Sequence, residues 1–251
     1  MIKKGIQIIS FSAAVLMIFS AAHSADWFLD METGWLSSGY NNVRIPNATG
    51  TLFSLSEDLD IQSKMFVRFR AGVMLGERHA VSLLAAPLTL NAQGQVDQEI
   101  FFFEEQFPAQ APLDAVYTFN SYRATYRYDL VRSSKWTVGI GFTAKIRDAV
   151  IKVESLDKSS EKTNVGFVPL LHFRVEYFFT PQIRALLEGD ALASPGGQGR
   201  AEDILLGLVV KAGNSWDIKA GYRMIEGGAD VDEVYNFAWL NLYTVGTIFR
   251  F

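Results

Sequence analysis

The chain has 251 residues, no cysteine and a formal net charge of −4, and hydrophobic residues make up 49% of it. The absence of cysteine excludes disulfides, thiol chemistry and a lipid-modified N-terminal cysteine. The scattered, slightly acidic charge argues against nucleic acid as a partner. The sequence contains no phosphate-binding glycine loop, metal-ligand cluster or dinucleotide fingerprint, so we expect no metal and no cofactor.

The first 24 residues have the composition of an export signal. Two lysines precede an apolar run from Ile6 to Phe19, and a small-residue cleavage site ends at Ser24. The run is shorter than the roughly 20 residues that a membrane-spanning helix needs. We therefore expect a signal peptide over residues 1–24 and one mature domain over residues 25–251. A retained N-terminal anchor is the alternative.

The mature chain lacks any further segment that a helix could use to cross a membrane. Without the two lysines of residues 1–24, 21 basic and 27 acidic side chains give a net charge of −6. No run of 18 apolar residues follows the signal. Only helices and closed barrels satisfy their backbone hydrogen bonds in lipid, so a membrane-spanning mature chain must be a barrel.

Apolar and polar residues alternate with a period of two in segment after segment, which is the pattern of a strand with one apolar face. The strands predicted in this way are residues 27–35, 64–75, 79–91, 114–130, 136–147, 166–179, 184–191, 203–211, 216–224 and 235–251. The segment 79–91 has the poorest alternation, and its Pro87 predicts a bulge or kink. The closing segment is expected to pair with residues 27–35, and its Asn241 falls on the apolar face.

The connections between these strands alternate in length. Short turns are predicted at residues 76–78, 132–134, 180–182 and 213–215, and longer connections at 39–62, 93–113, 154–164, 194–201 and 227–234. This alternation is typical of membrane barrels with short periplasmic turns and longer outside loops. We predict ten strands. The wall has twelve strands if residues 52–55 and 100–103 also belong to it, and eight if residues 79–91 are not a wall strand.

The export signal, the alternating strands, the unequal connections and the final Phe251 resemble those of Gram-negative outer-membrane β-barrel proteins. The resemblance implies an all-β, antiparallel up-and-down barrel in the outer membrane, in contact with its lipid and lipopolysaccharide. It also implies that the barrel-assembly machinery reads the closing strand, so that Tyr243, Phe249 and Phe251 form the assembly signal.

Charged residues occupy the polar phase of nearly every predicted strand, and in a barrel this phase faces the lumen. These residues are Asp30, Glu32, Arg68, Arg70, Arg123, Arg127, Lys145, Arg147, Arg174, Glu176, Arg184, Glu188, Asp190, Asp203, Lys219 and Arg223. Unpaired charges in a confined interior are costly, so we expect them to pair. About ten strands leave a lumen that is either filled by side chains or a narrow pore. An excess of inward arginine and lysine would favour small anions in such a pore.

His172 is the candidate for acid–base chemistry. Its predicted position lies opposite Glu188 or Asp190, and a histidine oriented by a carboxylate can act as a general base. No local motif of the known outer-membrane barrel enzymes accompanies it, and the nearest inward hydroxyl is that of Thr143. We therefore favour a structural histidine within the ion-pair network and predict no catalytic residue.

Three functions fit these patterns. The favoured one is a structural or narrow-channel barrel with a charged lumen. The second is a barrel enzyme that hydrolyses lipid or peptide with His172 and a carboxylate. The third is a protein that binds a ligand through the loops at residues 39–62 and 93–113. The acidic segment 226–233 lacks the spacing of known calcium loops and is interpreted as a solvated hairpin.

Overall fold

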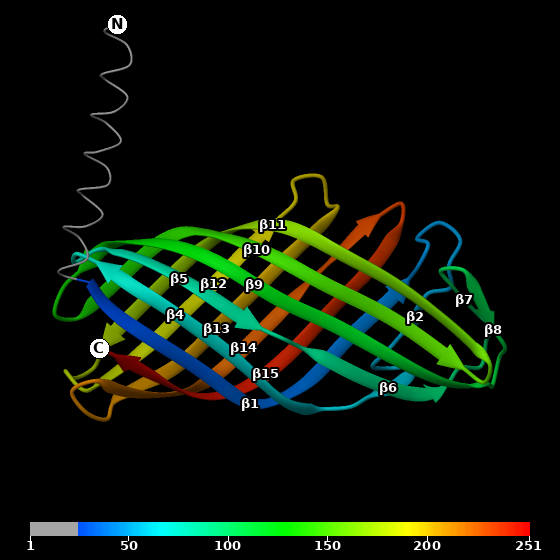
Figure 1. Ribbon diagram of the computed structural model, residues 1–251, viewed down its shortest axis with the longest axis horizontal. Coiled ribbons are helices and arrows are strands. Elements are labelled where there is room, and N and C mark those ends of the chain that lie inside the picture. Colours follow the sequence, from blue (N-terminus) through cyan, green and yellow to red (C-terminus); the bar gives the residue numbers. More distant parts are fainter. Residues whose placement is uncertain (1–24) are drawn as a thin grey trace, which may run out of the picture.

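The computed structural model describes residues 25–251, and the predicted export signal lies outside the described residues. Antiparallel strands wrap into an elongated barrel (Figure 1). The barrel closes where β1 (Ala25–Arg44) pairs with β15 (Val234–Arg250), as the sequence predicts. Among residues 25–251, no helix is long and apolar enough to cross a membrane.

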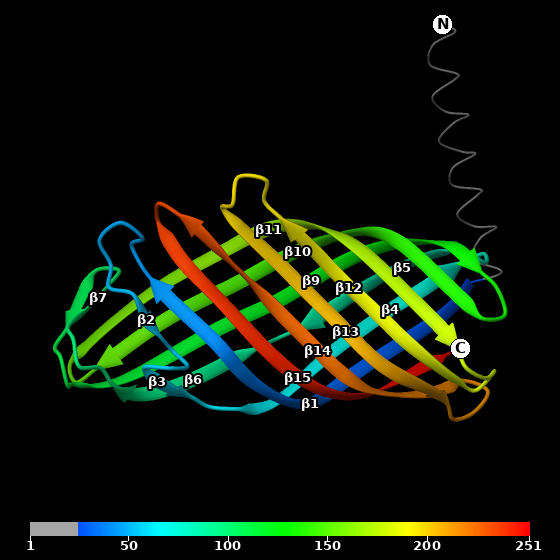
Figure 2. The ribbon, with the colours of Figure 1, turned by 180° about the vertical axis from the view of Figure 1, so that it is seen from behind.

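The wall has ten strands, and each pairs with its neighbours along the chain. In order they are β1, β4 (Lys64–Leu75), β5 (His79–Ala86) with its continuation β6 (Thr89–Gln95), β9 (Pro112–Arg132), β10 (Trp136–Ser155), β11 (Lys158–Phe178), β12 (Ile183–Ala193), β13 (Gly199–Lys211), β14 (Trp216–Val231) and β15. Both β5 and β6 pair with β9, so they are one wall strand that breaks at Pro87. Figure 2 shows the β12–β15 side of the same wall.

The two ends of the barrel differ. The terminal end holds the four short turns at their predicted positions, together with a backbone hydrogen bond from Trp27 to Phe251. The opposite end, here the loop end, carries further short strands (Figure 1). These are β2 (Phe53–Ser54), β3 (Leu59–Ile61), β7 (Ile100–Phe102) and β8 (Glu105–Phe107).

The structure corrects two of the predicted long connections. Residues 154–164 and 227–234 are mostly strand, and the turns between β10 and β11 and between β14 and β15 have only two residues. The alternation fades there because these strands extend past the lipid-facing part of the wall. The twelve-strand alternative is wrong, since β2 only flanks β1, and β7 pairs with β8 in a separate two-stranded sheet.

An apolar belt surrounds the half of the barrel nearest the terminal end. Its outward side chains include Leu29, Trp35, Met65, Phe69, Leu83, Tyr126, Ile140, Phe142, Phe167, Leu187, Leu206, Ile218 and Val245, all exposed. They come from every wall strand. An apolar patch of this extent is rare on a protein surface that meets water, and a continuous belt is the lipid-facing surface of a transmembrane barrel.

Asn241 lies within this belt with its side-chain oxygen hydrogen-bonded. Its side-chain oxygen accepts a hydrogen bond from the Tyr222 hydroxyl at 2.6 Å and another from the Trp239 indole at 2.8 Å. The two aromatic side chains therefore cover the amide oxygen from the same outer face. This removes much of the cost of a polar side chain at an apolar surface.

The side chains of the predicted assembly signal project outward from β15. Tyr243 and Phe251 are exposed, and the Phe249 ring lies 4.6 Å from Trp216 and 5.5 Å from Phe251 between centroids. The aromatic cluster of Trp216, Phe249 and Phe251 thus forms part of the rim at the terminal end.

Closure of the barrel depends on Gly34 in β1. Its φ is +148°, and a Cβ at this position would lie 1.9 Å from the backbone oxygen of Tyr243 on β15. We expect Gly34→Ala to lower the free energy of unfolding by about 1–3 kcal/mol, because a side chain strains the backbone at the seam. Urea unfolding of the refolded protein in lipid vesicles, followed by tryptophan fluorescence, measures this.

Gly213→Ala is the matched control, because a Cβ there would meet nothing within 4 Å. Equal stability of the two alanine variants would contradict a special role for Gly34 in closing the wall.

Candidate functional site

A band of paired charges crosses the middle of the barrel, and we call it the waist network. It contains seven basic and seven acidic side chains: Arg68, Arg70, Arg123, Arg174, Arg184, Lys219 and Arg223 with Asp30, Glu32, Glu176, Glu188, Asp190, Asp203 and Asp217. All are buried residues except Arg70, which is partly buried. The network is therefore charge-balanced, and it does not contain the excess of positive charge that a small-anion pore would use.

Several ion pairs span the lumen from one wall to the other. Arg70 on β4 pairs with Glu188 on β12, and these two strands stand on opposite sides of the ring. Arg68 on β4 donates to Asp203 on β13 at 2.9 Å. Side chains that meet across the axis leave no open bore at this level, as expected for a small barrel whose interior is filled.

Asp203 and Glu32 are the two most connected carboxylates. Asp203 accepts hydrogen bonds from Arg68, Arg123 and Arg223, with the Arg123 contact at 2.6 Å. Glu32 accepts two from Arg223, at 2.8 and 3.0 Å, and one from Lys219 at 2.7 Å. Charge-assisted and partly bidentate bonds of this kind are what repay the desolvation of a buried ion.

A second chain of pairs leads from the waist toward the terminal end. Glu176 lies between Arg174 at 2.9 Å and Arg184 at 2.7 Å. Arg184 also donates to Asp217 at 2.6 Å, and Asp217 accepts a further bond from Arg250 at 2.7 Å. This chain borders an open cavity of about 450 Å³ at the terminal end.

His172 belongs to the waist network. It lies opposite Asp190 in the β11–β12 register, and its Nδ1 is 2.8 Å from Asp190 Oδ1. Asp190 also accepts bonds from Thr143 at 2.7 Å and Arg123 at 2.7 Å. The Thr143 hydroxyl thus donates to the carboxylate and not to the imidazole. Without a hydroxyl aimed at the histidine, the trio lacks the nucleophile–base pair that hydrolysis needs.

Three residues predicted to line the lumen lie away from the waist. Arg127 pairs with Asp129 at 2.8 Å, near the cavity of the terminal end. Lys145 and Arg147 on β10 lie on the opposite side, toward the loop end, where they border a different cavity. Among residues 25–251, no group of three or more histidines and carboxylates is arranged to hold a metal ion.

The inside of the loop half is an apolar core that the alternation did not reveal. Its buried members include Leu36, Val43, Ile45, Phe53, Leu55, Leu90, Ile100, Phe102, Phe107, Leu113, Tyr117, Val153 and Leu240. The loops at residues 39–62 and 93–113 supply several of them, so their apolar side chains fold into the barrel. The signal in the sequence was the apolar character of both strand faces, as in residues 237–242. Burial in this core raises the pKa of Tyr117.

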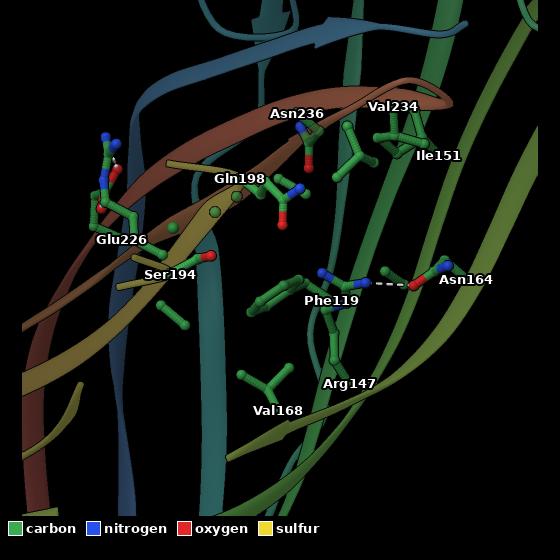
Figure 3. A pocket seen from close by; sticks show the side chains of 18 of the residues that line it. Phe119, Arg147, Ile151, Asn164, Val168, Ser194, Gln198, Glu226, Val234 and Asn236 are labelled. Atoms are coloured by element: carbon green, nitrogen blue, oxygen red, sulfur yellow. Dashed lines mark hydrogen bonds and ion pairs between the residues drawn. The ribbon is translucent and has the colours of Figure 1, made fainter. Parts of the chain in front are cut away.

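Beside this core lies a cavity of about 300 Å³, which we call the side cavity (Figure 3). Arg147 and Asn164 project into it from β10 and β11, and Ser194 and Gln198 face them from the β12–β13 connection (Figure 3). Phe119, Ala149, Ile151, Val168, Leu192 and Val234 add apolar lining. Its volume is at the lower limit of pockets that hold small ligands, about 300–1,000 Å³.

Two of the three carboxylates that line the side cavity form ion pairs. Glu226 accepts two bonds from Arg200, both at 2.7 Å, and one from the Tyr40 hydroxyl. Burial and the bond to Glu226 raise the pKa of Tyr40. Glu233 pairs with Lys162 at 3.8 Å across the rim. The lining thus contains four basic side chains, Lys145, Arg147, Lys162 and Arg200, against three carboxylates, Glu202, Glu226 and Glu233.

Removing the carboxylate of Asp203 tests the energetic role of the waist network. We expect Asp203→Asn to lower the free energy of unfolding by about 3–5 kcal/mol, because three buried guanidinium groups lose their shared anion. Urea unfolding in vesicles measures the change. Asp232→Asn in the exposed β14–β15 turn is the control and should change it by less than about 0.5 kcal/mol. Similar effects of both variants would contradict this role.

Comparison with known proteins identifies the fold alone. No protein-family model and no curated protein matches the chain. Among solved structures, the outer membrane protease OmpT of Escherichia coli is 9% identical, with a TM-score of 0.52, 90% of this chain covered and 97% of that one. Ail of Yersinia pestis, crystallised with a heparin analogue, is 12% identical (TM-score 0.39, 90% and 99% covered), and an outer membrane channel of Pseudomonas putida F1 is 9% identical (TM-score 0.43, 90% and 95%). The chain is thus an integral β-barrel with the fold of Gram-negative outer-membrane proteins.

Proposed function

We propose that this barrel is closed to solutes at its waist and binds a small ligand in its loop half. The observation that carries the proposal is the contrast between the two halves. A balanced set of buried ion pairs joins opposite walls at the waist, whereas the side cavity beyond it has polar and apolar lining without a filling side chain. A pocket that combines an apolar lining with a few directed polar groups is typical of small-molecule sites.

We further propose the usual placement of such a barrel. Residues 1–24 direct export and are removed, the terminal end faces the periplasm, and the loop end faces outside, where it meets lipopolysaccharide. The closing strand, with Tyr243, Phe249 and Phe251, is the segment that the assembly machinery receives. The outward direction of these three side chains on β15 supports this assignment.

The rival functions receive less support from the geometry. A porin-like pore needs a continuous aqueous path, and the waist network and the apolar core both lie in its way. An enzyme centred on His172 needs an accessible nucleophile, whereas this histidine is buried among ion pairs. A closed barrel that binds a ligand accounts for both the sealed waist and the open side cavity.

A planar-bilayer recording tests closure. We expect the refolded protein to give no stable conductance steps at neutral pH, because the cross-lumen pairs of Arg70 and Arg68 occupy the axis. A porin refolded in the same way is the positive control. Reproducible steps from the protein alone would contradict the closed waist.

Replacing the last residue tests the assembly signal. We expect Phe251→Ala to reduce the folded, heat-modifiable protein recovered from outer membranes, because the rim loses an exposed ring stacked on Phe249. Leu156→Ala, an exposed side chain in the β10–β11 turn, is the control. Equal recovery of both variants in a gel-shift assay would remove Phe251 from the signal.

A further inference from the structure

The wall of the barrel has an unpaired edge on β11. From residue 158 to residue 170 this strand pairs with β10 alone, whereas from Leu171 onward it pairs with β12 as well. The difference arises because β12 ends at Ala193, so that β11 continues past it toward the loop end. A free strand edge is exceptional in a transmembrane barrel, where lipid offers no hydrogen-bond partners.

The sequence stops the ladder at this point. Extending the β11–β12 register by two residues beyond the last pair, Leu171 with Ala191, would set Pro169 opposite Ala193. Proline has no N–H to donate and is found at strand edges rather than within a sheet. The short turn region at residues 194–198 then carries the chain from β12 into β13, below the top of β11.

The part of the free edge nearest to β12 lies at the height of the lipid-facing belt. Val165 and Phe167 point outward from it with 71% and 64% exposure, and Ile146, opposite Phe167 on β10, is also exposed. On the inner side of the same edge, Asn164 and Val168 line the side cavity (Figure 3). The edge therefore separates the outer belt from the cavity. From residue 158 to residue 170, β12 does not continue the wall beside it.

Two basic side chains at the floor of the side cavity lack anionic partners. Lys145 is 3% exposed and lies 4.6 Å from the centroid of Phe119, with no hydrogen bond and no carboxylate within 4.0 Å among residues 25–251. Arg147 donates one bond to Asn164, while its buried Nε has no acceptor. A buried lysine without an anionic partner is costly, so an anion bound in the cavity would stabilise Lys145, and the half-buried Arg147 beside it could share that anion.

We propose that the side cavity binds a single-chain anionic amphiphile, such as a fatty-acid carboxylate, which enters from the membrane past the free edge of β11. The head group lies against Lys145 and Arg147. The chain runs along Val168 and Leu192 and leaves toward the lipid between β11 and β12. This inference rests on the proposed function and names the ligand class and the path of entry.

A photolabelling experiment tests the ligand class. The full-length mature protein is refolded into phosphatidylcholine vesicles and incubated with dodecanoate that carries a diazirine on its last carbon. We expect saturable labelling that unlabelled dodecanoate displaces and that the equivalent dodecanol probe does not reproduce. Equal labelling by the carboxylate and the alcohol would overturn the anionic site.

Variants test the two cations. Lys145→Met and Arg147→Gln should each reduce the affinity of the probe roughly tenfold, the effect of losing one charge-assisted contact. Lys152→Met is the control, because this lysine lies on the same strand but pairs with Glu154 at 2.7 Å outside the cavity. All variants are first shown to keep the heat-dependent gel shift of a folded barrel. If neither cavity variant lowers the affinity, the inference is overturned.

The position of the label tests the path. Mass spectrometry should find the label from the last carbon on residues 167–171 of β11 or 191–193 of β12. Label confined to residues 225–236, on the far wall, would overturn entry past β11. Ion flux is recorded on the same vesicles. Sealed vesicles without saturable labelling overturn this inference alone, whereas conducting vesicles overturn the proposed function itself.

Discussion

The constraint on which the whole structure depends is that lipid satisfies no backbone hydrogen bond. Every strand within the apolar belt must therefore pair on both sides, and the seam between β1 and β15 completes the ring. Gly34 lets the two strands approach at that seam, and the short turns of the terminal end keep consecutive strands adjacent. Closure then forces alternate side chains inward, so the charges of the sequence are brought together in the lumen.

Inside the lumen, these charged side chains are stable only when they form ion pairs. Asp203 brings together arginines from β4, β9 and β14, and Glu32 joins β1 to β14. The same contacts that remove the cost of burial also tie opposite walls to each other, which closes the lumen at the waist. Toward the loop end an apolar core replaces this network, because there the loops fold inward and supply their own hydrophobic side chains.

The free edge of β11 is a long gap in the pairing of the wall, and it lies beside basic side chains that no carboxylate neutralises. Pro169 ends the pairing with β12, and Lys145 and Arg147, which have no carboxylate partner, lie just inside. An unpaired strand edge and basic side chains without carboxylate partners, found at one place, form the proposed site. The nearby carboxylate Glu226 is engaged by Arg200, so it does not neutralise them.

The sequence by itself determined the class of fold, because a period of two with one apolar phase requires a sheet with one face in lipid. It also placed the four short turns, the pairing of the closing strand with residues 27–35 and a carboxylate, Glu188 or Asp190, opposite His172, and the structure shows that this carboxylate is Asp190. Only the tertiary structure decided which charges meet across the lumen, since pairs such as Arg70 with Glu188 depend on the curvature of the closed ring. Only the tertiary structure decided that β11 extends beyond the end of β12. The length of a strand past the lipid-facing belt depends on the strands beside it, and this part of a strand shows no apolar–polar alternation in the sequence.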